Sequence, residues 1–351
     1  MNQGSSVRWV AALQRAWLSR GALARILWPL SAVFGAITAS RRLSYRWGWQ
    51  RTTALPVPVV VVGNLIVGGA GKTPTVMAIV QLLRRQAFTP GIVSRGYGRS
   101  GDAALLVKRD MAVAMCGDEP LLMHLRTGAP VAVGRDRVAA ARLLLHVHPR
   151  VNALVSDDGL QHLALARDVQ VLVFDERGAG NGWLLPSGPL REALPNALPK
   201  QTLVLYNAAV PSTPLPGAIA RRSLGGVCAL DAWWRGELPT MAQFHALRGR
   251  PVLAAAGLAR PQRFFGMLRE AGLSITALPL PDHHDFATLP WPADTANVVL
   301  TEKDAVKLDP ARMGATRVWV ATLDFVPQAA FETALLALLP PPGTAHGNAI
   351  A

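Results

Sequence analysis

The sequence predicts an α/β fold with a mostly parallel, doubly wound sheet and helices on both of its faces. Short apolar runs rich in β-branched residues have the composition of strands that are buried on both sides, as in Val57–Val62 and Val169–Asp175. Helix-like segments lie between such runs, for example Val76–Leu83 and the residues from 134 to about 148. Strands that alternate with helices in this way are typical of parallel sheets. The 351 residues are enough for one large or two medium domains.

One strand runs into a glycine-rich loop that has the features of a P-loop, a phosphate-binding loop. Backbone N–H groups of such a loop surround phosphate oxygens, its lysine neutralises the β- and γ-phosphates, and its hydroxyl residue binds Mg²⁺. The usual pattern has glycine at position 66, where this chain has Ile66. A glycine-rich turn with a surface lysine is the alternative, which the preceding strand and the following helix disfavour. The predicted nucleotide-binding residues are Gly68, Gly69, Ala70, Gly71, Lys72 and Thr73.

A second strong signal is the apolar run from Val151 that ends in Asp157 and Asp158. A P-loop needs a carboxylate that reaches its Mg²⁺ or the bound waters. Parallel sheets bind ligands at the carboxyl ends of their strands, where these two residues would lie. The alternative is that they cap the following turn, but adjacent buried carboxylates are costly without a cation. We therefore expect Thr73, Asp157 and Asp158 to form a magnesium site.

The N-terminal region is basic and rich in tryptophan. Residues 1–101 contain 13 Arg and Lys and no Asp or Glu, while the whole chain has a net charge of +14. An uncharged run, Ile26–Ala39, lies among five of the ten tryptophans. These features favour an anionic membrane surface over a nucleic acid. The run is shorter than the ~20 residues of a spanning helix, so we expect a helix lying in one leaflet. A single span, a cleaved signal peptide and a transit peptide are the alternatives.

Three polar loops are further candidates. A basic glycine loop follows the short strand Gly91–Val93, and it begins with Ser94 and Arg95. Asp118 lies in the sequence GDEP, where it could also simply cap the next helix. The cluster PDHH contains His283 and His284, with no cysteine or further histidine nearby in the sequence to suggest zinc.

The ordered set of these motifs resembles one known family. GNLIVGGAGKTP, SRGYGR, GDEP, SDDGLQH, GNGWLLPSGPLRE, PDHH and LTEKDAVK occur in this order. Together they are similar to the tetraacyldisaccharide 4'-kinases, which phosphorylate the 4'-hydroxyl of the lipid A disaccharide 1-phosphate and give lipid IVA. The resemblance covers roughly residues 10–335. The absence of glycine at position 66 is shared by that family.

The resemblance implies roles that spacing alone does not give. It implies an ATP- and Mg²⁺-dependent kinase with Lys72 on the phosphates, Asp118 as the base that accepts the sugar hydroxyl's proton, and His283 as its partner. It also makes five residues candidates for contacts with substrate or nucleotide phosphates: Arg95, Gln161, His162, Asn181 and Arg191.

The expected organisation follows from the same features. Residues 1–50 would be a membrane-anchoring helical segment, 51–210 a P-loop kinase core, 211–339 a C-terminal α/β subdomain that contributes to the active-site cleft, and 340–351 a tail. We expect a monomer at the cytoplasmic face of the bacterial inner membrane, with no nucleic acid partner. A P-loop switch or membrane-insertion factor that uses the same loop is the alternative function.

Overall fold

The computed structural model describes residues 13–342, so the ends of the predicted anchor and tail lie outside the described residues. The chain divides into two compact units. The first comprises residues up to Arg95, Asp136–Arg221 and the residues from Pro327 onward, and the second comprises Gly96–Arg135 and Arg222–Val326. The sequence predicted contiguous domains divided near residue 210. Both units are instead discontinuous, because residues 96–135 leave the first unit after a strand and join the second.

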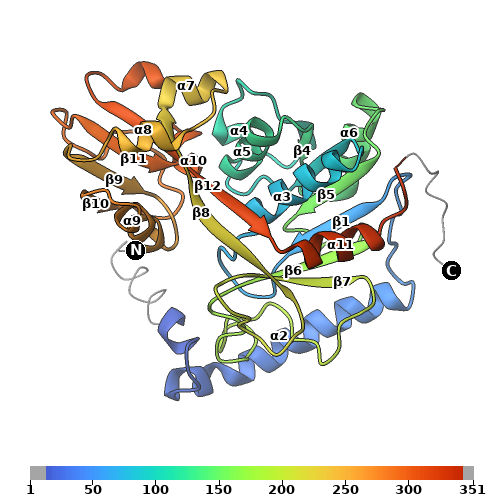
Figure 1. Ribbon diagram of the computed structural model, residues 1–351. Coiled ribbons are helices and arrows are strands. Elements are labelled where there is room, and N and C mark those ends of the chain that lie inside the picture. The colour runs from blue at the N-terminus through green and yellow to red at the C-terminus, as the bar shows by residue number, and fades with distance from the viewer. Residues whose placement is uncertain (1–12, 343–351) are drawn as a thin grey trace. The chain divides into compact units, whose positions relative to one another are not determined.

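The first unit contains a parallel sheet in the order β7–β6–β1–β5–β2 (Figure 1). Its strands are β1 (Val59–Gly63), β2 (Pro90–Ser94), β5 (Ala153–Asp157), β6 (Val169–Asp175) and β7 (Thr202–Asn207). β1 and β5 are completely buried, as the apolar runs predicted. In the register of this pair Val62 lies beside Asp157, so both strands end at the same edge. The α/β fold with a mostly parallel sheet is confirmed.

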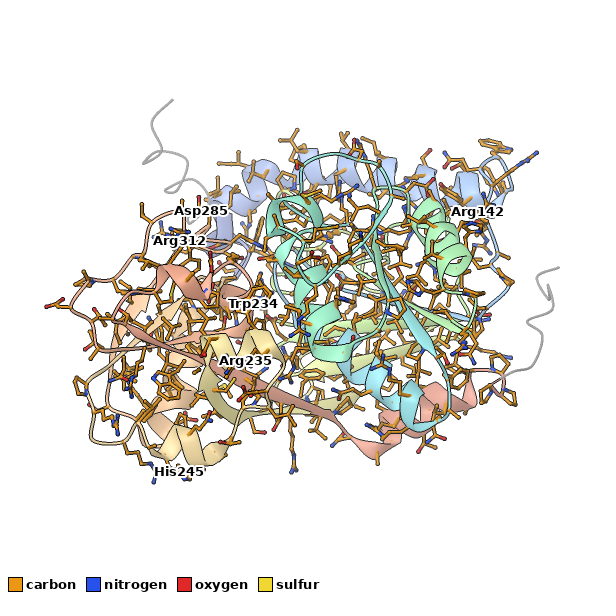
Figure 2. The ribbon with its side chains drawn as sticks, turned by 90° about the horizontal axis from the view of Figure 1, so that it is seen from above. Arg142, Trp234, Arg235, His245, Asp285 and Arg312 are labelled. Carbon is orange, nitrogen blue, oxygen red and sulfur yellow. The ribbon has the colours of Figure 1, made fainter. Side chains whose placement is uncertain are left out.

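Helices cover this sheet. α3 (Lys72–Arg85) packs on β1, β2 and β5, α6 (Arg137–Val147) packs on β2, and α11 (Ala329–Ala337) packs on β7. The side chain of Asp136 caps α6 by accepting from the backbone N–H groups of Val138 and Ala139. Arg142, labelled in Figure 2, lies on α6.

The helix α2 (Ala22–Arg46) has 25 residues, well beyond the uncharged run Ile26–Ala39 (Figure 1). By length and composition it is long and apolar enough to cross a membrane. Its exposed apolar side chains recur at helical spacing and form one stripe. We call these residues the α2 stripe: Ile26, Leu30, Val33 and Ile37, with 73%, 58%, 58% and 62% of their surface exposed.

The second unit has its own core around the strands β9 (Val252–Ala256), β10 (Ile275–Pro279), β11 (Asn297–Thr301) and β12 (Arg317–Pro327). These strands are parallel in the order β10–β9–β11–β12. α9 (Pro261–Glu270) buries Phe264, Phe265 and Leu268 against this sheet. Pro261 opens this helix, where the missing N–H costs nothing.

Apart from the strand β8, the remaining elements of this unit are short. They include β3 (Leu105–Leu106) and β4 (Val131–Val133), which pair antiparallel. The long strand β8 (Ala218–Ala229) begins in the first unit and ends in the second. The helices are α4 (Val113–Cys116), α5 (Asp118–Thr127), α7 (Leu230–Arg235), α8 (Met241–His245), α10 (Glu302–Ala305) and the 3₁₀ turn η1 (Pro310–Arg312). Figure 2 labels Trp234 and Arg235 on α7 and His245 on α8.

Candidate functional site

The glycine-rich loop joins β1 to α3, as the sequence predicted. Gly68 and Gly71 have φ angles of 96° and 97°, in the left-handed region that glycine adopts without strain. Lys72 is the first residue of α3. Its Nζ lies 3.2 Å from Oδ1 of Asn64 and 3.4 Å from Oδ1 of Asp158. The lysine is therefore held at the edge of the sheet where β1 and β5 end.

Side chains hold four consecutive carbonyl groups of this loop. Arg177 donates to the carbonyls of Val67 and Gly69 at 3.1 and 3.2 Å. Asn64 donates to the carbonyl of Gly68 at 3.0 Å, and Asn207 donates to that of Ala70 at 3.1 Å. In a trans peptide the N–H points opposite to the C=O. The N–H groups of residues 68–71 are therefore directed away from these donors, as a phosphate-binding loop requires.

Ile66, where the usual pattern has glycine, connects the loop to a later segment. Its side chain is completely buried, and it forms an antiparallel bridge with Leu190. The neighbouring Val67 donates its N–H to the carbonyl of Pro189 at 2.9 Å. Ile66 fills a completely buried site, which glycine would leave empty.

The two aspartates at the end of β5 have different surroundings. Asp157 is buried and accepts from Oγ of Ser94 at 3.0 Å. Asp158 has a φ of 47° and faces Lys72 and Arg191, both at 3.4 Å. Burial alone would raise the pKa of Asp158, but Lys72 and Arg191 lower it below its ordinary value. Asp158 is therefore a carboxylate at neutral pH.

The chemical types of these side chains suit a magnesium ion. Carboxylates and a hydroxyl are the hard ligands that Mg²⁺ takes, and it completes its shell with phosphate oxygens and water. Asp157 and Asp158 lie at one strand end, and Thr73 lies in the first turn of α3, directly after Lys72. The residues needed for such a site are present, and their role as ligands stays a prediction.

The predicted substrate residues lie in different surroundings in the first unit. Arg191 contacts both Asp158 and Gln161, at 3.4 and 3.5 Å. His162 is 3.8 Å from Asp136, and its pKa is lowered by burial and by the charge of Arg137. Arg95 is exposed directly after β2.

Asn181 is turned toward the N-terminal segment. Its amide Nδ2 donates to the backbone carbonyls of Ala16, Ser19 and Ser187 at 3.1, 3.2 and 2.8 Å. Only 8% of its surface is exposed. These contacts indicate that it holds two segments together.

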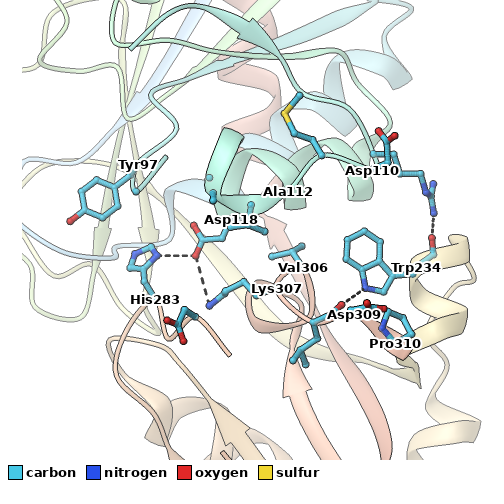
Figure 3. Close-up of a pocket in the computed structure, with 18 residues that line it drawn as sticks. Tyr97, Asp110, Ala112, Asp118, Trp234, His283, Val306, Lys307, Asp309 and Pro310 are labelled. Atoms are coloured by element: carbon cyan, nitrogen blue, oxygen red, sulfur yellow. Dashed lines mark hydrogen bonds and ion pairs between the residues drawn. The ribbon is translucent and has the colours of Figure 1, made fainter. Parts of the chain in front are cut away.

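In the second unit, Asp118 and His283 form a hydrogen-bonded pair (Figure 3). Nδ1 of His283 lies 2.8 Å from Oδ2 of Asp118, while His284 accepts the N–H of Phe286 instead. The other oxygen of Asp118 accepts the N–H of Glu119 in the first turn of α5, whose N-cap residue is Gly117. The contact that the family resemblance implied is thus present for His283.

The surroundings of this pair determine its charge. Burial alone would raise the pKa of Asp118, but the hydrogen bond from His283 and the charges of Lys303 and Lys307 lower it below the ordinary value. The same hydrogen bond raises the pKa of His283, against burial and the charge of Lys303. Asp118 is therefore an ionised hydrogen-bond acceptor at neutral pH.

A cavity of about 640 Å³ lies beside the pair and is lined only by residues of the second unit (Figure 3). Asp118, His283 and Lys307 lie on one side of it. Apolar side chains such as Ala112 and Val306 also line it. The pair therefore faces a space that can admit a ligand.

Sequence reasoning did not single out Asn64, Arg177 and Asn207, and it named Ser94 only as the start of the basic glycine loop. In the first unit these four residues hold the loop and Asp157. Ser94 and Asn207 end their strands, and Asn64 and Arg177 follow theirs within two residues. Polar residues at the carboxyl ends of apolar strands were the signal that could have identified all four.

Comparisons with known proteins agree on one family. Residues 23–340 match the model of the family described as tetraacyldisaccharide-1-P 4'-kinase. A tetraacyldisaccharide 4'-kinase of Methylibium petroleiphilum is 56% identical over 94% of this chain and 94% of its own length. One from Leptothrix cholodnii is 54% identical over 96% of this chain and 98% of its own.

A solved structure is similar as well. The crystal structure of LpxK from Aquifex aeolicus, described as an "apo" form in complex with ATP, has a TM-score of 0.75 at 27% identity. The match covers 91% of this chain and 100% of that one. The chain belongs to the tetraacyldisaccharide-1-P 4'-kinase family.

Proposed function

We propose that this chain transfers the γ-phosphoryl group of ATP to the 4'-hydroxyl of the lipid A tetraacyldisaccharide 1-phosphate and so forms lipid IVA. The observation that carries the proposal is that the family match spans both the glycine-rich loop and the Asp118–His283 pair. A switch protein or insertion factor, the alternative weighed from the sequence, would use the loop but has no use for a base directed at a sugar hydroxyl.

The first unit binds ATP in this proposal. Phosphoryl transfer needs charge neutralisation and exact positioning more than covalent chemistry. Lys72 and the N–H groups of residues 68–73 would hold the β- and γ-phosphates, and the LpxK of Aquifex aeolicus was solved with ATP. Thr73, Asp157 and Asp158 would hold Mg²⁺, which neutralises charge on the phosphates. Arg191 and Lys72, which contact Asp158, would fix the direction of that carboxylate.

The second unit supplies the base. Asp118 accepts the proton of the 4'-hydroxyl as the bond from oxygen to phosphorus forms. Its low pKa makes it a weak base, which suits a loose transition state in which the proton leaves late. His283 holds the carboxylate in one orientation through its Nδ1 hydrogen bond. The charges of Lys303 and Lys307 keep the carboxylate ionised before the reaction.

The proposed location is the cytoplasmic face of the inner membrane, with the chain acting as a monomer. An acylated disaccharide 1-phosphate stays in a lipid leaflet with its anionic sugars at the surface. The α2 stripe offers apolar side chains to the lipid, and Arg41 and Arg46 lie at one end of α2 to meet anionic headgroups, while Arg42 there is paired with the buried Glu192.

The direct test is transfer of radiolabelled phosphate from ATP to the purified disaccharide 1-phosphate in mixed micelles. We expect the full chain to form a product labelled at the 4'-position, in a Mg²⁺-dependent reaction. Lys72→Met should abolish the label, because it removes the positive charge that neutralises the transferred phosphoryl group. Purified, folded protein that hydrolyses ATP but never labels the disaccharide would contradict the proposal.

A further inference from the structure

The motif TEKDAVK, residues 301–307, begins where β11 ends and is held rigidly. Oγ1 of Thr301 donates to Oδ2 of Asp304 at 2.8 Å, and the N–H of Gly257 donates to the same oxygen at 3.2 Å. Asp304 is completely buried. Glu302, also buried, accepts from Nε1 of Trp233 at 3.0 Å. These hydrogen bonds fix the backbone of the motif within its own unit. The side chains of Lys303 and Lys307 therefore extend from a rigid backbone.

Lys303 joins two segments that carry the acid–base pair. Its Nζ lies 3.2 Å from Glu119 on α5 and 3.6 Å from Asp282, which precedes His283. The third neighbour is Nε2 of His283, at 3.3 Å. Burial alone would lower the pKa of Lys303, but Glu119, Asp118 and Asp282 raise it above the ordinary value, so the side chain is an ammonium group.

An ammonium group has three donors and no acceptor. Nε2 of His283 must therefore be the acceptor in this contact, and the ring proton must lie on Nδ1, which faces Asp118. We propose that Lys303 is a positioning residue, which selects the Nδ1–H tautomer of the neutral His283 ring and so directs that proton to Asp118. This inference rests on the proposed role of Asp118 as the base.

The same geometry makes Lys303 oppose a second proton on the ring. A protonated Nε2 would carry its N–H toward a like charge at 3.3 Å. The other groups around the ring are Asp118 and Tyr97, with Asp282 at 4.0 Å from Nε2. Asp118 and Asp282 favour the charged form of the ring, and together they raise the pKa of His283 above its ordinary value. Lys303, the cation in contact with the ring, opposes this rise. Lys307 lies instead 4.0 Å from Asp118.

The test is an NMR titration of the full-length chain in detergent micelles, labelled with ¹⁵N and ¹³C at histidine. The His283 signal is assigned by its loss in His283→Gln. We expect Lys303→Met to raise the apparent pKa of His283 by roughly one pH unit, because a neighbouring charge at contact distance shifts a pKa by that order. We also expect the ¹⁵N shifts to lose the pattern of the pure Nδ1–H tautomer.

Lys303→Arg keeps the charge and a donor, so it should titrate within a few tenths of a unit of the wild type. Lys200→Met, an exposed lysine of the first unit, controls for the loss of one charge. Lys303→Gln is measured in parallel in case the methionine variant does not fold. An unchanged His283 pKa in a folded, uncharged variant would overturn the proposal, as would an equal rise in Lys200→Met. Because the readout needs no turnover, its failure is distinct from failure of the kinase assay.

Discussion

Asp118 shows how a single residue is kept charged in a site that opposes charge. It is about 5% exposed, and burial of a carboxylate without partners favours the neutral form. His283, Lys303 and Lys307 reverse that preference, and their combined effect lowers the pKa of Asp118. Asp118 is therefore ionised at physiological pH. Its proposed role as a base then depends on how its carboxylate is oriented toward the sugar hydroxyl.

The first prediction concerns the carboxylate itself. Asp118→Asn keeps the shape of the side chain but cannot accept a proton, so kcat should fall by about 100- to 10,000-fold. ATP affinity, measured by calorimetry, should stay near the wild-type value, because the nucleotide is proposed to bind the first unit. Asp294→Asn, an exposed aspartate of the second unit, is the matched control. A near-normal kcat in Asp118→Asn would remove the base role.

The second prediction is a pH dependence. His283→Ala removes the hydrogen bond that lowers the pKa of Asp118, so burial then has more weight and the pKa rises. Since the base must be ionised, activity is lost as pH falls through this pKa. The acid limb of the kcat/KM profile should therefore move to higher pH in His283→Ala, by roughly one unit. An acid limb at the wild-type pH would show that His283 does not act through Asp118.

At the scale of elements, the ends of parallel strands organise the first unit. Asn64, Arg177 and Asn207 come from three different strand ends, yet all three donate hydrogen bonds to carbonyls of the glycine-rich loop. A salt bridge between Arg177 and the buried Asp175 fixes the guanidinium at 2.9 Å. The loop is thus shaped by its neighbours as much as by its own glycines.

The third prediction tests that arrangement. Arg177→Met removes donors from the carbonyls of Val67 and Gly69, so the loop should lose its fixed shape and bind ATP about tenfold more weakly, for ~1.5 kcal/mol lost. Arg177→Lys keeps a positive charge near Asp175 but cannot reach the carbonyls of both Val67 and Gly69. Relative to Arg177→Met, it should therefore restore thermal stability more fully than ATP affinity. Thermal unfolding and ATP calorimetry of each variant separate the two effects. Equal ATP affinity in the wild type, Arg177→Met and Arg177→Lys would show that Arg177 does not shape the glycine-rich loop for ATP binding.

The same elements show what the sequence could predict. Local patterns identified the loop, the strand with two aspartates and the helix after Lys72, because each depends on neighbours in the chain. The contact of His283 with Asp118 joins residues 165 positions apart, and no local pattern specifies it. The transfer of residues 96–135 to the second unit depends likewise on which core buries them.

At the scale of the whole molecule, α2 is joined to the segment that also supports the glycine-rich loop. Ser31 on α2 donates to the carbonyl of Leu184 at 2.9 Å and lies 2.7 Å from Oγ of Ser187. Nε1 of Trp17 donates to the carbonyl of Pro186 at 2.9 Å. A few residues later, Leu190 forms the bridge with Ile66. The face of α2 that carries Ser31 is thus used within the first unit, which leaves the α2 stripe for another partner.

The last prediction is that this partner is a lipid surface. Ile26→Glu or Val33→Glu puts a charge in the α2 stripe, and losing one buried apolar side chain costs about 1.5–3 kcal/mol. Binding to anionic vesicles, measured by co-sedimentation, should therefore fall by about tenfold or more. ATP affinity should not change, because the stripe is exposed and the loop is held by other residues. Gln262→Glu, on the exposed side of α9, adds the same charge and should bind vesicles normally. If both stripe variants bound vesicles as the wild type does, the α2 stripe would not be the membrane-binding face, and residues outside the stripe would have to account for any membrane association.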